Sequence, residues 1–166
     1  MPQGPPTPSG YVTVQDYIRA QAQEVGIPPE LALAVAEQES DFGRNPGPNP
    51  ASGAAGVFQF VPSTAGQRGM KNPMDPQENI QHGVRYLREL LDRHNLDLEG
   101  ALKEYGGVKT NTTYVPEVLA RIPKFSQSAP PSAPATPQGT TGTQPSPSSP
   151  SGPPAPRGFL QGLRGT

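Results

Sequence analysis

Proline is spread very unevenly along this chain of 166 residues, and its distribution limits which part can fold. Of the 24 prolines, ten lie in residues 130–156 and four in residues 2–8. Residues 126–156 contain no charged side chain and consist of Pro, Ser, Thr, Ala, Gly and Gln. Such a segment buries too little apolar surface to offset the entropy lost on ordering. We therefore expect a disordered N-terminal tail at 1–10, one compact domain at 11–125 and a disordered linker at 126–156.

The composition excludes several classes of protein. There is no cysteine, hence no disulfide framework, no thiolate nucleophile and no cysteine-bound zinc. Thirteen basic and fourteen acidic residues give a net charge of −1, so no basic field favours nucleic acid as a partner. The longest apolar run, Leu31–Ala36, is far below the roughly 18 residues that a membrane span needs. The first residues contain neither a basic nor an apolar region, so we expect no signal peptide.

Residue spacing predicts neither a metal nor a cofactor. His82 and His94 are twelve residues apart on one predicted helix, about three turns, which is too far for both to bind one metal ion. The acidic spacing of a calcium loop is absent. The glycine-rich segment around residues 53–56 lacks the lysine and the preceding strand of a phosphate-binding loop. We expect both histidines to be surface or half-buried residues.

Helical spacing and capping signals recur throughout the compact part. Residues 41–60 show no helical period and are rich in Gly, Asn and Pro, so they predict one long irregular loop, briefly extended near residues 56–61. The chain is expected to be all-α. The predicted helices are one between Thr13 and Gly26, one from Pro28 to about Ser40, a short one from Pro62, a longer one from Asp75 with an apolar stripe to Leu91, and two short ones at 98–105 and 114–122.

Glu39 is the most informative side chain, because it lies on the apolar side of the second predicted helix. At 100° per residue from Leu31, Glu39 falls at about 80°, between Val35 at about 40° and Ala32 at about 100°. Glu37, at about 240°, is expected on the opposite, solvated face. Burial and the helix C-terminus both raise the pKa of a carboxyl group. Cleavage of a glycosidic bond needs such a protonated acid, because the leaving oxygen must receive a proton.

The helical geometry alone leaves another arrangement open. Glu39 ends its helix, so its side chain could instead turn outward and pair with a neighbour such as Arg44. The segments that follow in the sequence favour the buried acid.

Five segments in order, together with Tyr114 and Val118 in the last predicted helix, carry a family pattern. They are Leu31 to Glu39-Ser40, Ser52-Gly53-Ala54-Ala55-Gly56-Val57-Phe58-Gln59-Phe60, Pro62-Ser63-Thr64, Asn79-Ile80-x-x-Gly83-x-x-Tyr86-Leu87, and Ala101-Leu102-Lys103-Glu104-Tyr105-Gly106-Gly107. This pattern resembles the soluble lytic transglycosylases. The resemblance spans about residues 13–122 and implies a lysozyme-like helical fold.

The resemblance also implies a reaction. Members of the family cleave the β-1,4 bond between N-acetylmuramic acid and N-acetylglucosamine in peptidoglycan glycan strands. A single glutamate, here Glu39, first protonates the leaving oxygen and then deprotonates the muramyl 6-hydroxyl, which gives a 1,6-anhydro sugar. A one-carboxylate mechanism fits this chain, which shows no obvious partner for Glu39 on a second helix, whereas two-carboxylate glycosidases pair two acids. Asp41 is the nearest alternative base, although we expect it to lie past the helix end.

The same resemblance implies six substrate-binding residues, which are Ser40, Ser52, Phe58, Gln59, Tyr105 and Tyr114. Four of them have a structural alternative, and Ser52 and Tyr114 have none. Gln59 is expected to line the sugar cleft through its amide, or to fix the loop by a hydrogen bond. The Tyr105 hydroxyl is expected to help position the acid, or Tyr105 is only core. Phe58 is either a wall of the cleft or packing. Ser40 follows the acid and either contacts substrate or caps the helix. Tyr114 matches the closing helix of the family.

The chain departs from the family pattern at two positions. The loop serine of the family stands three residues before the first loop glycine, a position held here by Pro50, so Ser52 is the candidate from a shifted register. Gly106 replaces an asparagine of the family, and Asn111 is the candidate to supply the missing amide.

The loop Ser-x-Ala-x-Gly-x-Phe-Gln-Phe and the lack of a signal peptide favour a bacteriophage origin. We expect a virion-associated enzyme that opens the cell wall locally and acts at the wall or in the periplasm. Residues 157–166 regain apolar side chains and are either a frayed tail or a docking peptide for virion proteins. Two rivals remain: a hydrolytic muramidase, and a non-catalytic virion structural protein that binds peptidoglycan.

Overall fold

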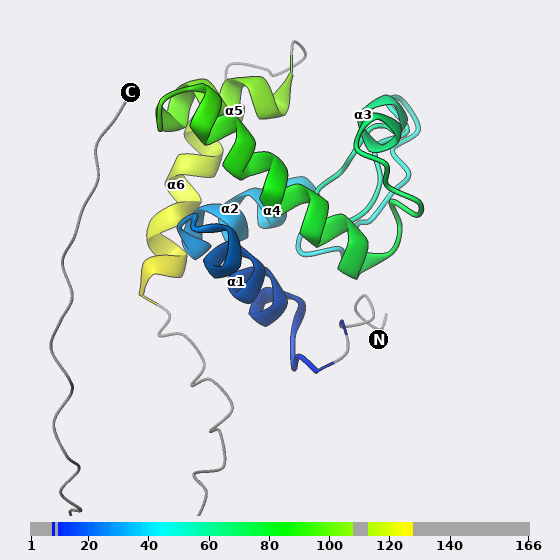
Figure 1. Ribbon diagram of the computed structural model, residues 1–166, viewed down its shortest axis with the longest axis horizontal. Helices are drawn as coiled ribbons and strands as arrows, with labels where there is room; N and C mark the ends of the chain where they lie inside the picture. Colours follow the sequence, from blue (N-terminus) through cyan, green and yellow to red (C-terminus); the bar gives the residue numbers. More distant parts are fainter. Residues whose placement is uncertain (1–7, 9, 108–112, 128–166) are drawn as a thin grey trace, which may run out of the picture. The chain divides into compact units, whose positions relative to one another are not determined.

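The computed structural model describes residues 8, 10–107 and 113–127. These contain six helices and no strand beyond an isolated antiparallel bridge between Ala55 and Phe60, inside the predicted loop (Figure 1). The all-α prediction is confirmed for this part of the chain. The linker beyond residue 127, the segment 157–166 and Asn111 lie outside the described residues, and the domain limits stay predictions. The helices are α1 (Val14–Val25), α2 (Pro29–Ser40), α3 (Pro62–Gln67), α4 (Pro76–Arg93), α5 (Leu98–Gly106) and α6 (Tyr114–Ser126).

Local capping signals fix the ends of α1 and α4. The Thr13 hydroxyl accepts a hydrogen bond from the Asp16 amide at 3.1 Å, and α1 ends at Gly26, whose φ of 74° is left-handed. The Asp75 carboxylate accepts from the Glu78 amide at 2.7 Å where α4 begins. These ends agree with the predicted ones, because each is determined by residues within one turn.

The last helix is longer than predicted. The predicted helix ends at Ile122, but α6 continues through Pro123 to Ser126. Tertiary contacts hold this last turn: the Phe125 ring meets the Phe42 ring edge-on at 5.9 Å, and Lys124 pairs with a carboxylate of α2. These contacts compensate for the hydrogen bond that proline cannot donate inside a helix.

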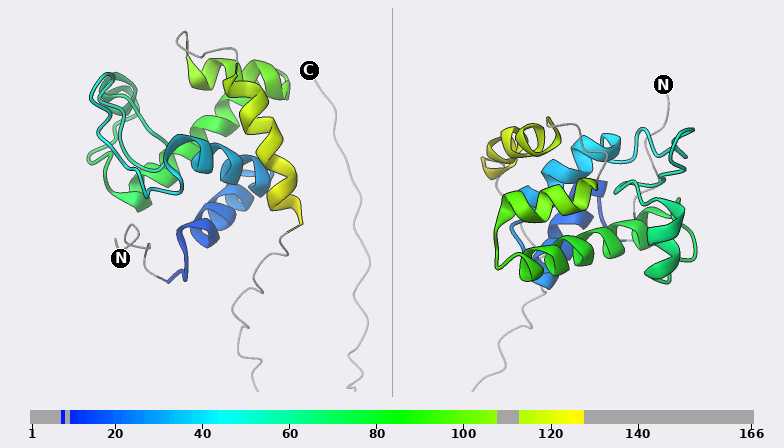
Figure 2. Two further views of the ribbon diagram at one scale, coloured as in Figure 1. Left: turned by 180° about the vertical axis from the view of Figure 1, so that it is seen from behind. Right: turned by 90° about the horizontal axis from the view of Figure 1, so that it is seen from above.

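Helix α2 lies at the centre of the core. Its residues Leu31–Ala36 are all buried, and α2 packs against both α1 and α6, while α4 packs against α1 and α5 (Figure 2). The expectation that Glu37 faces solvent is wrong, since its side chain is only 17% exposed. The reason is that α6 covers the polar side of α2 and brings Arg121 and Lys124 to Glu37.

The long loop is held in place by one side chain of α4. Asn79 is fully buried, and its Oδ1 accepts from the Phe58 amide at 2.7 Å. Its Nδ2 donates to the carbonyls of Ala55 at 3.1 Å and Pro73 at 2.8 Å. Gly56 has a φ of 83°, and a Cβ there would lie 2.0 Å from Asn79 Nδ2, so glycine is required. The loop therefore has one fixed position against α4.

Within the described part of the chain, every helix is too short or too polar to cross a membrane.

Candidate active site

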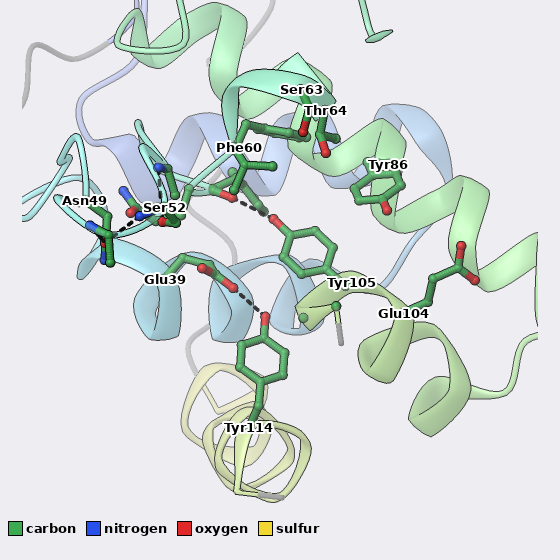
Figure 3. A pocket seen from close by; sticks show the side chains of 17 residues that line it. Glu39, Asn49, Ser52, Phe60, Ser63, Thr64, Tyr86, Glu104, Tyr105 and Tyr114 are labelled. Atoms are coloured by element: carbon green, nitrogen blue, oxygen red, sulfur yellow. Dashed lines mark hydrogen bonds between the residues drawn. The ribbon is translucent and has the colours of Figure 1, made fainter. Parts of the chain in front are cut away.

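A cleft of about 850 Å³ opens beside the C-terminal end of α2. The long loop, α3, α4, α5 and the start of α6 form its walls. Asn49 and Ser52 lie to one side of Glu39, and Tyr86 and Glu104 lie to the other (Figure 3). Glu39 therefore stands between the two ends of the cleft, where a long ligand would pass it.

Glu39 meets the hydroxyl of Tyr114 inside this cleft. The two side chains point toward one another from α2 and α6, and Tyr114 Oη donates to Glu39 Oε1 at 2.5 Å (Figure 3). Burial raises the pKa of Glu39 from 4.5 to about 7, although the hydrogen bond from Tyr114 lowers it. Glu39 is half-buried, and its raised pKa agrees with the expectation from the helical pattern. Near neutral pH this carboxyl group can therefore both give and take a proton.

The two alternatives to this arrangement of Glu39 are wrong. Arg44 does not pair with Glu39, because its Nη1 donates to both carboxylate oxygens of Asp41 at 3.1 Å. Asp41 is the C-terminal cap of α2, with a left-handed φ of 51°, and is not among the residues that line the cleft. Glu39 is thus the carboxylate of α2 that faces the cleft.

Tyr105 and Tyr114 have different partners. The Tyr105 hydroxyl donates to the Phe58 carbonyl at 2.9 Å, so it fixes the loop rather than the Glu39 carboxylate, and this corrects the role expected for it. Burial, and to a lesser degree the charge of Glu39, raise the pKa values of both tyrosines. Both hydroxyls therefore keep their protons and act as donors, and the one that reaches Glu39 belongs to Tyr114.

Gln59 and Ser52 both line the cleft, but part of each is engaged in the loop. Gln59 Nε2 donates to the carbonyls of Pro46 at 3.1 Å and Gly56 at 2.8 Å, which is the loop-fixing arrangement. The Ser52 hydroxyl accepts from the Ala54 amide at 3.3 Å. The Gln59 side-chain nitrogen therefore serves the loop, and its carbonyl oxygen is the atom suited to a ligand.

The expectation that Ser40 contacts substrate is wrong. Its side chain is 2% exposed, does not line the cleft, donates to the Val57 carbonyl at 2.7 Å and accepts from the Gly43 amide at 2.8 Å. Phe58 is 1% exposed and packs on Gly83, where a Cβ would lie 2.3 Å from the ring, so it is mainly core although it borders the cleft. Ser40 and Phe58 thus hold the loop against α2 and α4.

Comparison with known proteins decides the family. Residues 16–113, more than half of the chain, match the transglycosylase SLT domain family. The chain belongs to this family. The match lies within the span 13–122 predicted from the motifs, so the resemblance found in the sequence is confirmed.

The SLT domain has relatives in a phage and in bacteria. The chain is 36% identical over 99 residues to a transglycosylase of Enterobacteria phage PRD1, and the matched stretch covers 60% of this chain and 36% of the relative. It is 40% identical over 60 residues to membrane-bound lytic murein transglycosylase F of Shewanella halifaxensis, covering 36% of this chain and 12% of the relative. A similar protein of Alkalilimnicola ehrlichii is 33% identical over 78 residues, 47% of this chain and 15% of the relative. The chain thus spans about a third of the phage relative and less than a sixth of these bacterial ones.

Several cleft residues of this SLT domain were not predicted as site residues, among them Asn49, Tyr86 and Glu104. The Asn49 Oδ1 accepts from the amides of Ala51 at 2.9 Å and Ser52 at 3.2 Å, and Asn49 itself lines the cleft. Nothing local in the sequence marks Asn49 as different from the other loop asparagines. Only the folded loop brings it to the cleft.

Tyr86 and Glu104 form the other end of the cleft in the SLT domain. The Tyr86 ring contacts the Tyr105 ring, with centroids 5.5 Å apart, and the Arg68 guanidinium, which lies 4.6 Å from its centroid. Glu104 Oε2 lies 2.7 Å from His94 Nε2. Both residues lie inside segments that carry the family pattern, and this position was the sequence signal that could have identified them as cleft residues. Among the described residues, no group of three His, Cys, Asp or Glu side chains is arranged to hold a metal.

Proposed function

We propose that the chain is a peptidoglycan lytic transglycosylase. It cleaves the β-1,4 bond between N-acetylmuramic acid and N-acetylglucosamine and forms 1,6-anhydro-N-acetylmuramic acid, with Glu39 as the general acid and then the general base. The observation that carries this proposal is the Glu39 carboxyl group, buried beside the cleft, with a pKa of about 7 and a hydroxyl donor at 2.5 Å.

The reaction needs one carboxyl group in two protonation states. Protonated Glu39 gives its proton to the glycosidic oxygen as the bond from the muramyl C1 to that oxygen breaks. The Glu39 carboxylate then takes the proton of the muramyl 6-hydroxyl, whose oxygen forms the new bond to C1. Glu39 ends protonated, and no water is consumed. The Tyr114 hydroxyl stabilises the carboxylate between the two proton transfers, because it donates a hydrogen bond to the charged form.

The lining of the cleft supports a neutral glycan as ligand. Among the lining residues only Glu39 and Glu104 carry charge, and the other polar groups are amides, hydroxyls and phenols. Amides and hydroxyls both donate and accept hydrogen bonds, as sugar hydroxyls do. We propose Ser52, Gln59 and Asn49 as sugar contacts at the loop end.

We also propose that the chain is phage-encoded and acts locally on the cell wall from the virion. The phage PRD1 relative supports this proposal. Mass spectrometry of purified particles tests it, and detection of the chain only in the lysate contradicts it. Docking through residues 157–166 stays part of the proposal.

Glu39→Gln tests the chemistry, because it removes the acid and keeps the shape of the side chain. Muropeptides released from purified sacculi by the wild type and by the variant are identified by mass spectrometry. Glu99→Gln is the matched control, since Glu99 forms an exposed pair with Lys103 on α5. We expect anhydro-muramyl products from the wild type and the control, and none from Glu39→Gln.

Two other results would each contradict the proposal in a different way. Reducing-end products that depend on Glu39 would make the chain a hydrolytic muramidase. Absence of all products, with binding to sacculi intact, would make it a non-catalytic binding protein.

A further inference from the structure

Three consecutive residues of α2 each contact a different turn of α6. Glu39 accepts from the Tyr114 hydroxyl at 2.5 Å, and Gln38 Nε2 donates to Glu117 Oε2 at 2.8 Å. Glu37 forms ion pairs with Arg121, at 3.6 Å, and with Lys124. The C-terminal end of α2 thus contacts α6 along most of the length of α6.

The α6 partners lie on one face of that helix. Residues 114, 117, 121 and 124 are separated by three, four and three positions, which places them in a row along a helix. A rotation or a slide of α6 along its axis therefore changes all of these contacts together. The position of the Tyr114 hydroxyl is therefore linked to the contacts made about one, two and three turns further along α6.

Glu37 makes two of the contacts in this row. Its carboxylate is 17% exposed and is shared between two cations, whereas Arg121 and Lys124 are 34% and 62% exposed. A sheltered carboxylate with two cationic partners holds its geometry better than a single exposed ion pair. The Gln38 Oε1 is buried and has no hydrogen-bond partner, so Gln38 contributes only one bond to the row.

We propose that Glu37 is a positioning residue: its ion pairs with Arg121 and Lys124 hold α6 at the rotation that brings the Tyr114 hydroxyl onto the Glu39 carboxylate. The inference deepens the proposed function and rests on it for its catalytic meaning. The position of α6 can be measured without any catalytic turnover. The positioning role of Glu37 and the proposed function can therefore be tested separately.

The protonation of Glu39 reports the position of α6. Among the described residues, the titratable groups that face Glu39 are Tyr114 from α6 and Tyr105 from α5, and of these two Tyr114 donates to it. This hydrogen bond favours the ionised form, so it lowers the pKa of Glu39 against the effect of burial. If α6 turns just enough to break this hydrogen bond while Glu39 stays covered, the donor is lost and the pKa of Glu39 rises.

The test compares Glu37→Gln with Tyr114→Phe, which lacks the donor altogether. The carboxyl carbon of Glu39 is titrated by NMR, and its signal is assigned by its absence in Glu39→Gln. Loss of a hydrogen bond to a charged group should raise the midpoint by about one to two pH units in Tyr114→Phe. We expect a shift in the same direction in Glu37→Gln, and no further shift when the two changes are combined.

Controls separate positioning from general loosening. Glu99→Gln removes an exposed carboxylate on α5 and should leave the midpoint of Glu39 unchanged. The charge exchange Glu37→Lys with Arg121→Glu and Lys124→Glu should restore the wild-type midpoint, because it rebuilds both ion pairs in reverse and leaves no two cations facing one another. If Glu37→Gln does not fold, Arg121→Gln with Lys124→Gln removes the same ion pairs from the more exposed side.

An unchanged Glu39 midpoint in Glu37→Gln, with a shifted one in Tyr114→Phe, would overturn the inference and leave Glu37 as packing alone. Failure of the proposed function looks different. The wild type would then release no anhydro-muramyl products, whatever the titration of Glu39 shows.

Discussion

Replacing the buried acid should make the protein more stable at neutral pH. In the folded chain the pKa of Glu39 is raised from 4.5 to about 7. Below about pH 4.5 both the folded and the unfolded chain hold the proton, so Glu39 costs no stability through ionisation. As the pH rises toward 7, the unfolded chain ionises and the folded chain does not, so stability falls and then levels off above the folded pKa. At about 1.4 kcal/mol per pH unit, the loss is about 3 kcal/mol.

Glu39→Gln carries no such penalty, and its amide oxygen still accepts from Tyr114. We therefore expect Glu39→Gln to raise the free energy of unfolding by up to about 3 kcal/mol at pH 8 and to change it little at pH 4. Urea unfolding at both pH values measures this difference. Glu24→Gln is the control, because Glu24 is exposed and should give no comparable pH-dependent gain. A variant as stable as the wild type at pH 8, or stabilised equally at both pH values, would refute the reasoning.

Three further changes test other parts of the site, each by urea unfolding. Asn79→Ala leaves the buried Phe58 amide and the part-buried Pro73 carbonyl without this partner, while the Ala55 carbonyl keeps the Phe60 amide, and it should cost about 3 kcal/mol. Gly83→Ala places a Cβ 2.3 Å from the Phe58 ring and should cost about 1–3 kcal/mol, in part recovered by Phe58→Leu, whereas Gly66→Ala, with open space around it, should not destabilise. Tyr105→Phe removes one loop hydrogen bond, should cost about 1 kcal/mol, and should move the Glu39 midpoint less than Tyr114→Phe does. An equal or larger movement would contradict the assignment of Tyr114 as the donor.

Features determined within one turn of the chain could be predicted from the sequence. The ends of α1 and α4 followed from Thr13, Gly26 and Asp75, whose conformations and hydrogen bonds are local. The end of α6 did not, because contacts with α2 and with Phe42 outweigh the local effect of Pro123. The helix ends that depend on neighbouring residues could thus be predicted, and the end of α6, which depends on residues distant in the sequence, could not.

Helical geometry placed Glu39 on the apolar side of α2, and the family pattern in the segments that follow was needed to predict that its side chain faces inward. The same geometry misplaced Glu37, since it shows which side of a helix is polar and not what covers that side. The partners of Tyr105 and Tyr114 depend on where α5 and α6 pack, which no local pattern encodes. For this reason the acid could be predicted and its donor could not.

The hydrogen bond between Tyr114 and Glu39 joins residues 75 positions apart. A ribosome that adds roughly 5–20 residues per second needs several seconds to make the chain between them. During that interval the nascent chain carries Glu39 without its partner helix, open to water and with the acidity of an ordinary glutamate. The ability to hold a proton at neutral pH therefore arises only once the last helix has been made, and it belongs to the finished domain rather than to the helix that carries the acid.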